Sequence, residues 1–322
     1  MGGLFGAVVA RALDAWWDEL RRPDPFVVVE AAAGTGTLAR SILDAAPACA
    51  PALRYVLVER SDALRDQQAG VVPLEPPHWV LGPTEDEDDT MVSVKGSGPL
   101  FTSLADLPAQ PVTGVVLANE LVDNLPPLLL ERREGEWCEV RVGEEDGRLV
   151  EVLLPAAPLL TDEAERLAPD APEGGRIPLQ HRSVDWLRTA LAAVERGRVV
   201  LVDYADGTPS MARRPWTEWL RTYRSHGRGG HPLDDPGHQD VTCEVAVDQL
   251  ARVRPPAQDR SQADFLRAHG IEGLAAEAAA KWQERAHIGD LEAVRHRSRA
   301  GEAAALTDPA GLGAFRVLEW IV

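Results

Sequence analysis

The feature that most constrains the fold is a short apolar segment followed at once by a glycine-rich turn and a helical pattern. Residues 26–29 are apolar and mostly β-branched. Such a run is typical of a strand buried on both faces of a parallel sheet. Gly34 and Gly36 then form the turn, and residues 36–46 have the periodicity of a helix. This unit presents backbone N–H groups and a helix N-terminus to a nucleotide-like ligand.

The glycine turn by itself is compatible with two classes of ligand. Residues 34–39 fit the G-x-G-x-x-A pattern of dinucleotide-binding sites. Glu30 ends the expected strand and fits the acid-x-small-x-Gly-x-Gly pattern of S-adenosylmethionine sites, with Ala32 at the small position. A carboxylate there repels a pyrophosphate but attracts the cationic sulfonium and amino groups of S-adenosylmethionine. The residues therefore favour the methyl donor, and an ordinary strand–helix corner that binds no ligand stays open.

A second apolar run, residues 55–58, ends in another acid, Glu59. A carboxylate about 20 residues beyond the turn is placed to accept both ribose hydroxyls of an adenosine. We therefore predict a set of cofactor-binding residues, which comprises Glu30, Ala32, Gly34, Gly36, Glu59, Arg60 and Asn119.

Alternating strands and helices along the chain predict a doubly wound parallel sheet of the α/β class. An amphipathic helix is expected at residues 1–17. Further strands are expected at 54–59, 78–81, 113–120, 198–204 and 315–322, and further helices at 184–195, 261–274 and 274–305. Ligands of such sheets bind at the carboxyl ends of the strands. Four acids end expected strands, namely Glu30, Glu59, Glu120 and Asp203, and this convergence predicts a single site.

Between residues 128 and 154 the apolar pattern changes to alternation, and Glu134-Gly135 and Asp146-Gly147 are turn dipeptides. This pattern predicts an antiparallel meander inserted into the sheet. Residues 155–178 are expected to be irregular, and residues 205–240 to form a lid-like insertion. We predict one composite domain, in which residues 1–127 form the N-terminal half of the core, 128–182 the inserted part and 183–322 the C-terminal half.

The segment NELVDNLP, residues 119–126, follows the expected central strand at the place of the catalytic loop of S-adenosylmethionine methyltransferases. With YVLVERSDALRDQQ (55–68), VLVDYADG (200–207) and QADFLRAHGI (262–271), it resembles the MidA-type methyltransferase family. The resemblance implies a class I methyltransferase (Rossmann-like) fold with an inserted subdomain and S-adenosyl-L-methionine as cofactor. It also implies a protein partner as acceptor, because the family's mitochondrial member is a complex I assembly factor that dimethylates an arginine.

For an arginine acceptor, the guanidinium must be held by carboxylates and must lose a proton. Glu120, Asp123 and Asp203 are therefore the expected catalytic residues, and Tyr204, His226 and Asp240 are expected to contact the substrate. Ala32 stands where the family has a glycine, and the chain starts close to the family's LFG motif at residues 4–6. Two alternatives remain, an assembly or interaction protein with weak or no turnover, and an NAD-type oxidoreductase.

The chain carries 33 basic and 51 acidic residues, a formal net charge of −18. This balance predicts no nucleic-acid partner, because such binding depends on clusters of Lys and Arg. Three widely spaced cysteines and the lack of an apolar run of about 20 residues predict a reduced, cytoplasmic protein without a membrane partner. The spacing of His226, His231 and His238 matches no zinc signature, so no metal is expected. The acid-rich residues 84–98 are expected to form a solvated loop.

Overall fold

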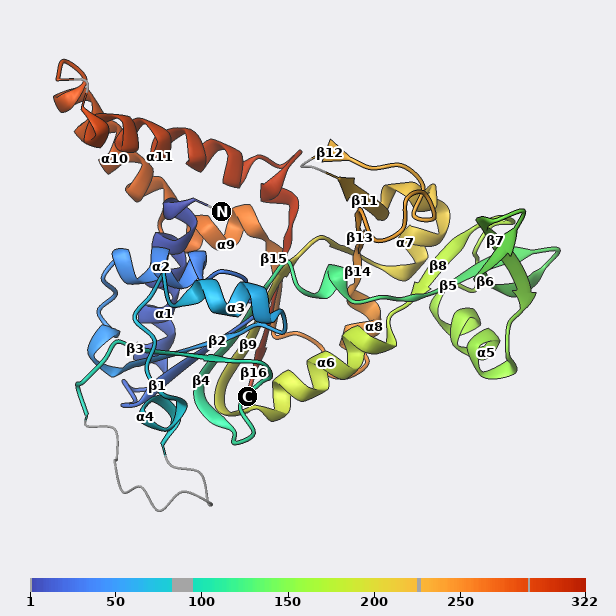
Figure 1. Cartoon of the computed structure of the whole chain (residues 1–322), viewed down its shortest axis with the longest axis horizontal. Coiled ribbons are helices and arrows are strands. Elements are labelled where there is room, and N and C mark those ends of the chain that lie inside the picture. Colours follow the sequence, from blue (N-terminus) through green and yellow to red (C-terminus); the bar gives the residue numbers. More distant parts are fainter. Residues whose placement is uncertain (1, 83–94, 225–226, 289) are drawn as a thin grey trace. The chain divides into compact units, whose positions relative to one another are not determined.

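The computed structural model describes residues 2–82, 95–224, 227–288 and 290–322 (Figure 1). The chain divides into two compact units. Unit 1 comprises residues 1–119, 190–202 and 256–322, and unit 2 comprises residues 120–189 and 203–255. The inserted segment expected at 128–182 falls in the first part of unit 2, and the lid-like segment expected at 205–240 falls in its second part.

Unit 1 is built on a seven-stranded sheet with the strand order β15-β16-β9-β4-β1-β2-β3. Its strands are β1 (Phe26–Ala31), β2 (Leu53–Val58), β3 (Leu100–Leu104), β4 (Val112–Asn119), β9 (Val194–Asp203), β15 (Gln258–Ser261) and β16 (Arg316–Ile321). The pairs β1–β2, β1–β4, β2–β3 and β4–β9 are parallel, and β15–β16 is antiparallel. The strand order reverses between β1 and β4, which is the topological switch point where doubly wound sheets bind ligands. The predicted fold class is therefore confirmed.

The centre of the sheet is fully buried, as the unbroken apolar runs predict. Every residue of β1 and β2 is buried. Gly114 of β4 lies between Val27 of β1 and Gly197 of β9 in the sheet register. A Cβ added at Gly114 would stand 1.9 Å from the carbonyl oxygen of Val27, and its φ of 154° is one that side chains rarely adopt. Glycine is thus required at this point for the three strands to pair.

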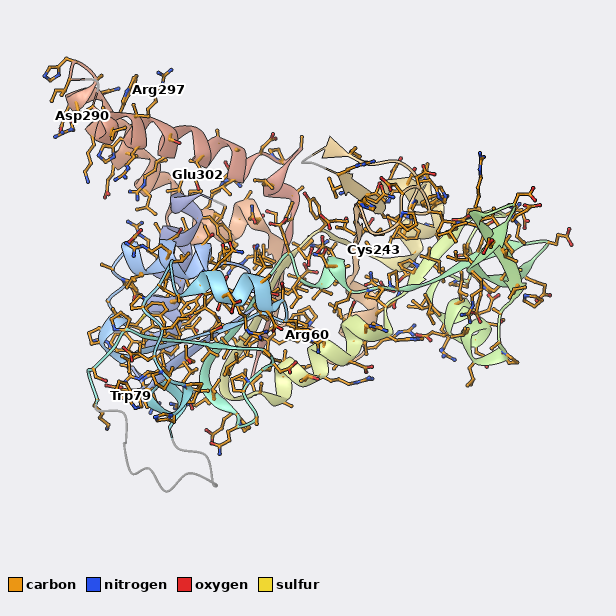
Figure 2. The ribbon with its side chains drawn as sticks, in the orientation of Figure 1. Arg60, Trp79, Cys243, Asp290, Arg297 and Glu302 are labelled. Atoms are coloured by element: carbon orange, nitrogen blue, oxygen red, sulfur yellow. The ribbon has the colours of Figure 1, made fainter. Side chains whose placement is uncertain are left out.

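The helices of unit 1 are α1 (Gly3–Glu19), α2 (Thr37–Asp44), α3 (Asp62–Gln68), α4 (Pro77–Leu81), α9 (Gln262–Ala268), α10 (Ile271–Arg285) and α11 (Leu291–Thr307). The 3₁₀ turns η1 (Ala50–Ala52) and η4 (Leu312–Ala314) complete it. Glu302 of α11, labelled in Figure 2, accepts a hydrogen bond of 3.2 Å from the backbone N–H of Leu4 at the start of α1. The negative charge of Glu302 at this position also interacts favourably with the positive end of the α1 dipole. Among the described residues, no helix is long and apolar enough to cross a membrane.

One strand expected from the sequence is wrong. Residues 78–81 form part of α4, and the third parallel strand is β3, which the sequence interpretation missed. Pro77 is the first residue of α4, where the fixed φ of proline favours a helix start. A short apolar run does not by itself distinguish a strand from a helix turn. Most of the acid-rich segment 84–98 lies outside the described residues.

The predicted meander is confirmed in unit 2. It consists of β5 (Leu128–Arg133), β6 (Glu136–Glu145) and β7 (Arg148–Pro155), and β8 (Arg176–Leu179) joins it to give the order β7-β6-β5-β8. Both turn dipeptides hold positive φ angles, 52° and 78° at Glu134 and Gly135, and 50° and 74° at Asp146 and Gly147. Two consecutive positive φ angles are the geometry of tight hairpin turns, which explains why these dipeptides predict the hairpins.

The rest of unit 2 is more regular than the sequence predicts. Residues 155–178 contain α5 (Pro158–Leu167), and the next helix, α6 (His181–Ala192), begins before Ser183 rather than after it. Residues 205–240 contain β10 (Ala205–Asp206), α7 (Thr208–Arg213), η3 (Trp216–Glu218), β11 (Leu220–Arg224) and β12 (Gly227–Arg228). The remaining elements are η2 (Val122–Asn124), β13 (Asp240–Cys243), β14 (Val245–Ala246) and α8 (Val247–Ala251). The proline and acidic residues of these segments interrupt the apolar periodicity by which a helix is recognised in a sequence. Helix α5 nevertheless contributes Leu167 to a core with Leu130 and Trp137.

Candidate functional site

The loop that follows β1 has the backbone conformation expected of a ligand-binding turn. Three of its residues hold left-handed φ angles, 57° at Ala32, 55° at Gly34 and 85° at Gly36. Ala32 occupies a conformation that favours glycine, at a cost of about 1–2 kcal/mol for a residue with a Cβ. Ala32 is an exposed residue of the loop. The conformation explains why a glycine is expected at residue 32, and alanine retains it.

Glu59, directly after β2, fixes this loop. Its Oε2 accepts the backbone N–H of Gly34 at 3.0 Å, and its Oε1 accepts that of Ser61 at 2.9 Å. The carboxylate is only partly buried. Since each oxygen can accept more than one hydrogen bond, Glu59 retains capacity for the hydroxyls of a ribose.

Gln68 of α3 also holds the loop after β1, and this role was not predicted from the sequence. It is fully buried, and its Nε2 donates to the carbonyl oxygen of Gly34 at 2.8 Å. The hydroxyl of Ser103 on β3 donates to Oε1 of the same amide at 2.5 Å. The only sequence signal is the pair of glutamines that ends the segment 55–68, and the other glutamine, Gln67, donates to the carbonyl of Ala63.

The side chain of Glu30 is buried in the core of unit 1 rather than exposed to solvent. Its side chain is 5% exposed, and its Oε2 accepts the hydroxyl of Tyr55 at 2.8 Å. Burial raises the pKa of Glu30 to about 7, although the bonds from Tyr55 and from the backbone of Ala39 partly offset this rise. At neutral pH the carboxyl is therefore partly protonated, unlike the open carboxylate that the charge argument assumed. Direct contact between Glu30 and a ligand stays a prediction.

The remaining predicted cofactor residues lie at the same edge of the unit 1 sheet. Asn119 ends β4, one residue beyond Ala118, which pairs with Ala31 of β1. Arg60 follows Glu59 and is largely exposed, with its guanidinium 3.4 Å from Asp106. Ligand contact by Asn119 and Arg60 stays a prediction.

A second cluster, the acid cluster, lies in unit 2 and consists of Glu120, Asp123, Asp203 and Tyr204. Asp203 is 1% exposed, and its Oδ2 accepts the backbone N–H groups of Val122 and Asp123 at 3.0 and 3.1 Å. Its Oδ1 accepts the N–H of Tyr204 at 2.9 Å. Asp203 therefore holds the η2 turn in place, and the backbone N–H of Val122 is a partner that the sequence did not reveal.

Burial and mutual repulsion change how the acid cluster titrates. Burial, with a smaller contribution from the charge of Glu120, raises the pKa of Asp123 to about 7. Burial and the charge of Asp123 hold the pKa of Asp203 well above its usual range. The pair thus retains a proton near neutral pH, and it can exchange one there. Such shifted carboxyls are typical of acid–base sites.

The backbone at Glu120 is also unusual. Glu120 is exposed and holds a left-handed φ of 51°. Non-glycine residues in this region cluster at functional sites, because surrounding structure must compensate for their strain. Tyr204 lies under the guanidinium of Arg221, which is 5.2 Å from the ring centroid, and burial raises the pKa of the phenol to about 12. Tyr204 is thus a neutral hydrogen-bonding group at physiological pH.

The predicted substrate residues other than Tyr204 are less informative. Asp240 begins β13, where its backbone pairs with Tyr223, and its side chain is exposed. His226 lies outside the described residues. Among the residues that the structure describes, no group of three His, Cys, Asp or Glu side chains could hold a metal ion.

The strand order of unit 1, the glycine turn after β1 and the acid after β2 together define a class I methyltransferase fold. Residues 8–263 match the model of a family described as S-adenosyl-L-methionine-dependent methyltransferases. The chain belongs to this family.

Among curated proteins, the mitochondrial protein arginine methyltransferase NDUFAF7 homolog of Drosophila melanogaster is 26% identical over 260 residues. The match covers 75% of this chain and 55% of that protein, so the chain spans about half the length of this relative. A solved structure from Burkholderia thailandensis is 26% identical with a TM-score of 0.78, covering 99% of this chain and 79% of that one.

A second solved structure from Burkholderia thailandensis, bound to S-adenosyl-homocysteine, is 24% identical with a TM-score of 0.77. It covers 100% of this chain and 77% of that one and shows the shared fold. The residues of unit 1 fit the family's cofactor. The partly exposed carboxylate of Glu59, beside the glycine turn that it holds, is an acceptor for the ribose hydroxyls of an adenosyl group.

Proposed function

We propose that the chain transfers a methyl group from S-adenosyl-L-methionine to an arginine side chain of a protein partner. The observation that carries the arginine acceptor is the acid cluster of unit 2, in which the exposed Glu120 lies close enough to Asp123 for its charge to raise the pKa of that carboxyl. The Drosophila relative, a protein arginine methyltransferase homolog by name, supports the same acceptor. S-adenosylmethionine supplies an electrophilic methyl group on a cationic sulfur.

The residues of the acid cluster have separate roles in this proposal. Glu120 and Asp123 hold the guanidinium, because carboxylates match the fork of its N–H groups. The pKa of a guanidinium is above about 12, so a proton must leave during transfer, and Asp123 in its unprotonated form accepts it. Asp203 is a positioning residue, since its carboxylate bonds the backbone of η2 rather than facing solvent.

Cofactor binding is tested first, by titration calorimetry with S-adenosyl-homocysteine and with NAD. We expect saturable binding of S-adenosyl-homocysteine only. Glu59→Ala should abolish it, because the change removes a ribose acceptor and frees the Gly34 N–H. Asp66→Ala, an exposed acid on α3, is the control and should retain wild-type affinity. Binding of NAD alone would refute the proposal in favour of an oxidoreductase.

Turnover is tested with radiolabelled S-adenosylmethionine on a peptide library with arginine or lysine at the centre. We expect methylarginine by mass spectrometry, and a loss of about 10²–10⁴-fold in rate for Asp123→Asn. Asp162→Asn, an exposed acid on α5, is the matched control. Cofactor binding without any methylated arginine would instead favour the second candidate, an interaction protein that retains the fold.

A further inference from the structure

Unit 2 contains a cavity of about 240 Å³ that opens beside the acid cluster. Asp123 belongs to both, since its carboxyl is part of the acid cluster and it also lines the cavity. Small-molecule sites occupy about 300–1,000 Å³. The cavity is therefore smaller than a typical ligand site and has the size for one or two amino-acid side chains.

The wall of this cavity is mainly apolar, with Leu129, Val140, Val142, Leu220 and Val241 among its residues. Two of them are exposed at the rim, Val142 of β6 at 61% and Val241 of β13 at 42%. Exposed apolar side chains grouped around a concave site mark a surface that binds a partner. Cys243, labelled in Figure 2, also lines the cavity at the end of β13.

The charged residues of the wall already have partners, and Oδ1 of Asp123 accepts a hydrogen bond of 2.7 Å from Nδ2 of Asn124. Glu151 accepts hydrogen bonds from both terminal nitrogens of Arg176, including one of 2.9 Å. Arg141 forms an ion pair with Glu139. An occupant of the cavity therefore gains mainly by burying apolar surface.

We propose that the cavity binds an aliphatic side chain of the acceptor protein, one or two residues from the arginine that is methylated. This inference rests on the proposed function. Glu120 and the ionised form of Asp123 attract the guanidinium by charge, and the apolar wall that Asp123 adjoins takes the neighbouring side chain. Because one residue of extended chain spans about 3.3–3.6 Å, adjacent residues of one segment reach both places.

The test uses fluorescein-labelled peptides with a central arginine in a glycine background. Leucine occupies one of the four positions from two before to two after the arginine, and binding is measured by anisotropy with saturating S-adenosyl-homocysteine. At one position at least, leucine should tighten binding about tenfold over glycine, equivalent to about 1.4 kcal/mol. Peptides that all bind within threefold of the glycine peptide would overturn the inference.

The matched variants lie on one hairpin. Val142→Asp places a charge at the cavity rim and should remove the leucine preference. Val152→Asp, on β7 but outside the cavity wall, should keep it. Val241→Asp tests the rim from β13, in case Val142→Asp fails to fold. Equal loss of the preference in rim and control variants would contradict a role for the cavity.

The same peptides separate this inference from the proposed function. Methylated arginine without a leucine preference would refute the cavity and leave the methyltransferase proposal intact. A leucine preference that Val142→Asp removes, on peptides whose arginine is never methylated, would support the cavity and refute arginine as the acceptor.

Discussion

The buried carboxyl of Glu30 should make the stability of unit 1 depend on pH, and Glu30→Gln should remove that dependence. The pKa of Glu30 rises from 4.5 to about 7 on folding because the side chain is buried. Below pH 4.5 the carboxyl is protonated in the folded and the unfolded protein, so its burial does not lower the free energy of unfolding there. As the pH rises from 4.5 to 7, the unfolded chain ionises first, and stability falls by about 1.4 kcal/mol per pH unit.

The loss from this one group levels off above pH 7 at about 3 kcal/mol, and between pH 5 and pH 8 it amounts to about 2.5 kcal/mol. Glutamine has the same shape and no charge, but its NH₂ adds a buried donor that costs about 1–3 kcal/mol at every pH. The absolute stability of Glu30→Gln is therefore not informative. The change in its difference from wild type between pH 5 and pH 8 isolates the ionisation.

Urea unfolding should be read by hydrogen exchange of peptides from β1 and β2, so that unit 1 is followed separately from unit 2. We expect Glu30→Gln to gain about 2.5 kcal/mol relative to wild type from pH 5 to pH 8. Glu284→Gln, the same change at an exposed site of α10, controls for the loss of one charge. If the difference in free energy of unfolding between wild type and Glu30→Gln is constant over this range, Glu30 ionises in the folded protein as it does in the unfolded chain. That result would refute the reasoning.

Three further results are expected. The methyl-transfer rate should rise with pH around 7, because Asp123 with its raised pKa can accept a proton only when ionised; a flat pH profile would remove Asp123 as the base. Ala32→Gly should be as stable as wild type in urea or gain up to about 1 kcal/mol, because relief of the left-handed strain offsets the entropy of glycine; a loss above about 1 kcal/mol would contradict the strain. Gly114→Ala should yield no soluble protein, because its Cβ would stand 1.9 Å from the Val27 carbonyl oxygen. The control Gly301→Ala adds its methyl group in open space on α11 and should raise the melting temperature, because alanine favours a helix over glycine. Soluble Gly114→Ala with near-native melting would show that the sheet can adjust there.

The parts of the fold that were predictable are those that local patterns determine. The apolar runs within β1, β2 and β4 predict buried strands, because consecutive apolar side chains point to both faces of a strand and both faces must then be covered. The two hairpin turns follow from dipeptides that tolerate positive φ. The predictions for residues 78–81 and 158–167 were wrong. Both segments are helices that begin at a proline and depend on packing against distant residues, and a short window of sequence does not contain that packing.

The sequence places the acids of the candidate site at strand ends, but it does not reveal the groups that hold them. Glu59 and Asp203 stand at strand ends, and topology brings strand ends to one edge of a sheet. Their hydrogen-bond partners are backbone N–H groups, at Gly34 and Val122, which leave no mark in a sequence. The inward direction of Glu30 was also hidden, because it depends on Tyr55 across the β1–β2 pair.

The hold of Asp203 on the η2 turn has a consequence for the order in which the protein matures. The carboxylate and the backbone N–H of Asp123 that it binds are 80 positions apart in the chain. A ribosome that adds about 5–20 residues per second synthesises the anchor roughly 4–16 s after the turn. During that interval the acidic turn has emerged without the group that shapes it. Newly made chains should therefore pass through a stage in which the glycine loop after β1 can form while the acid cluster cannot.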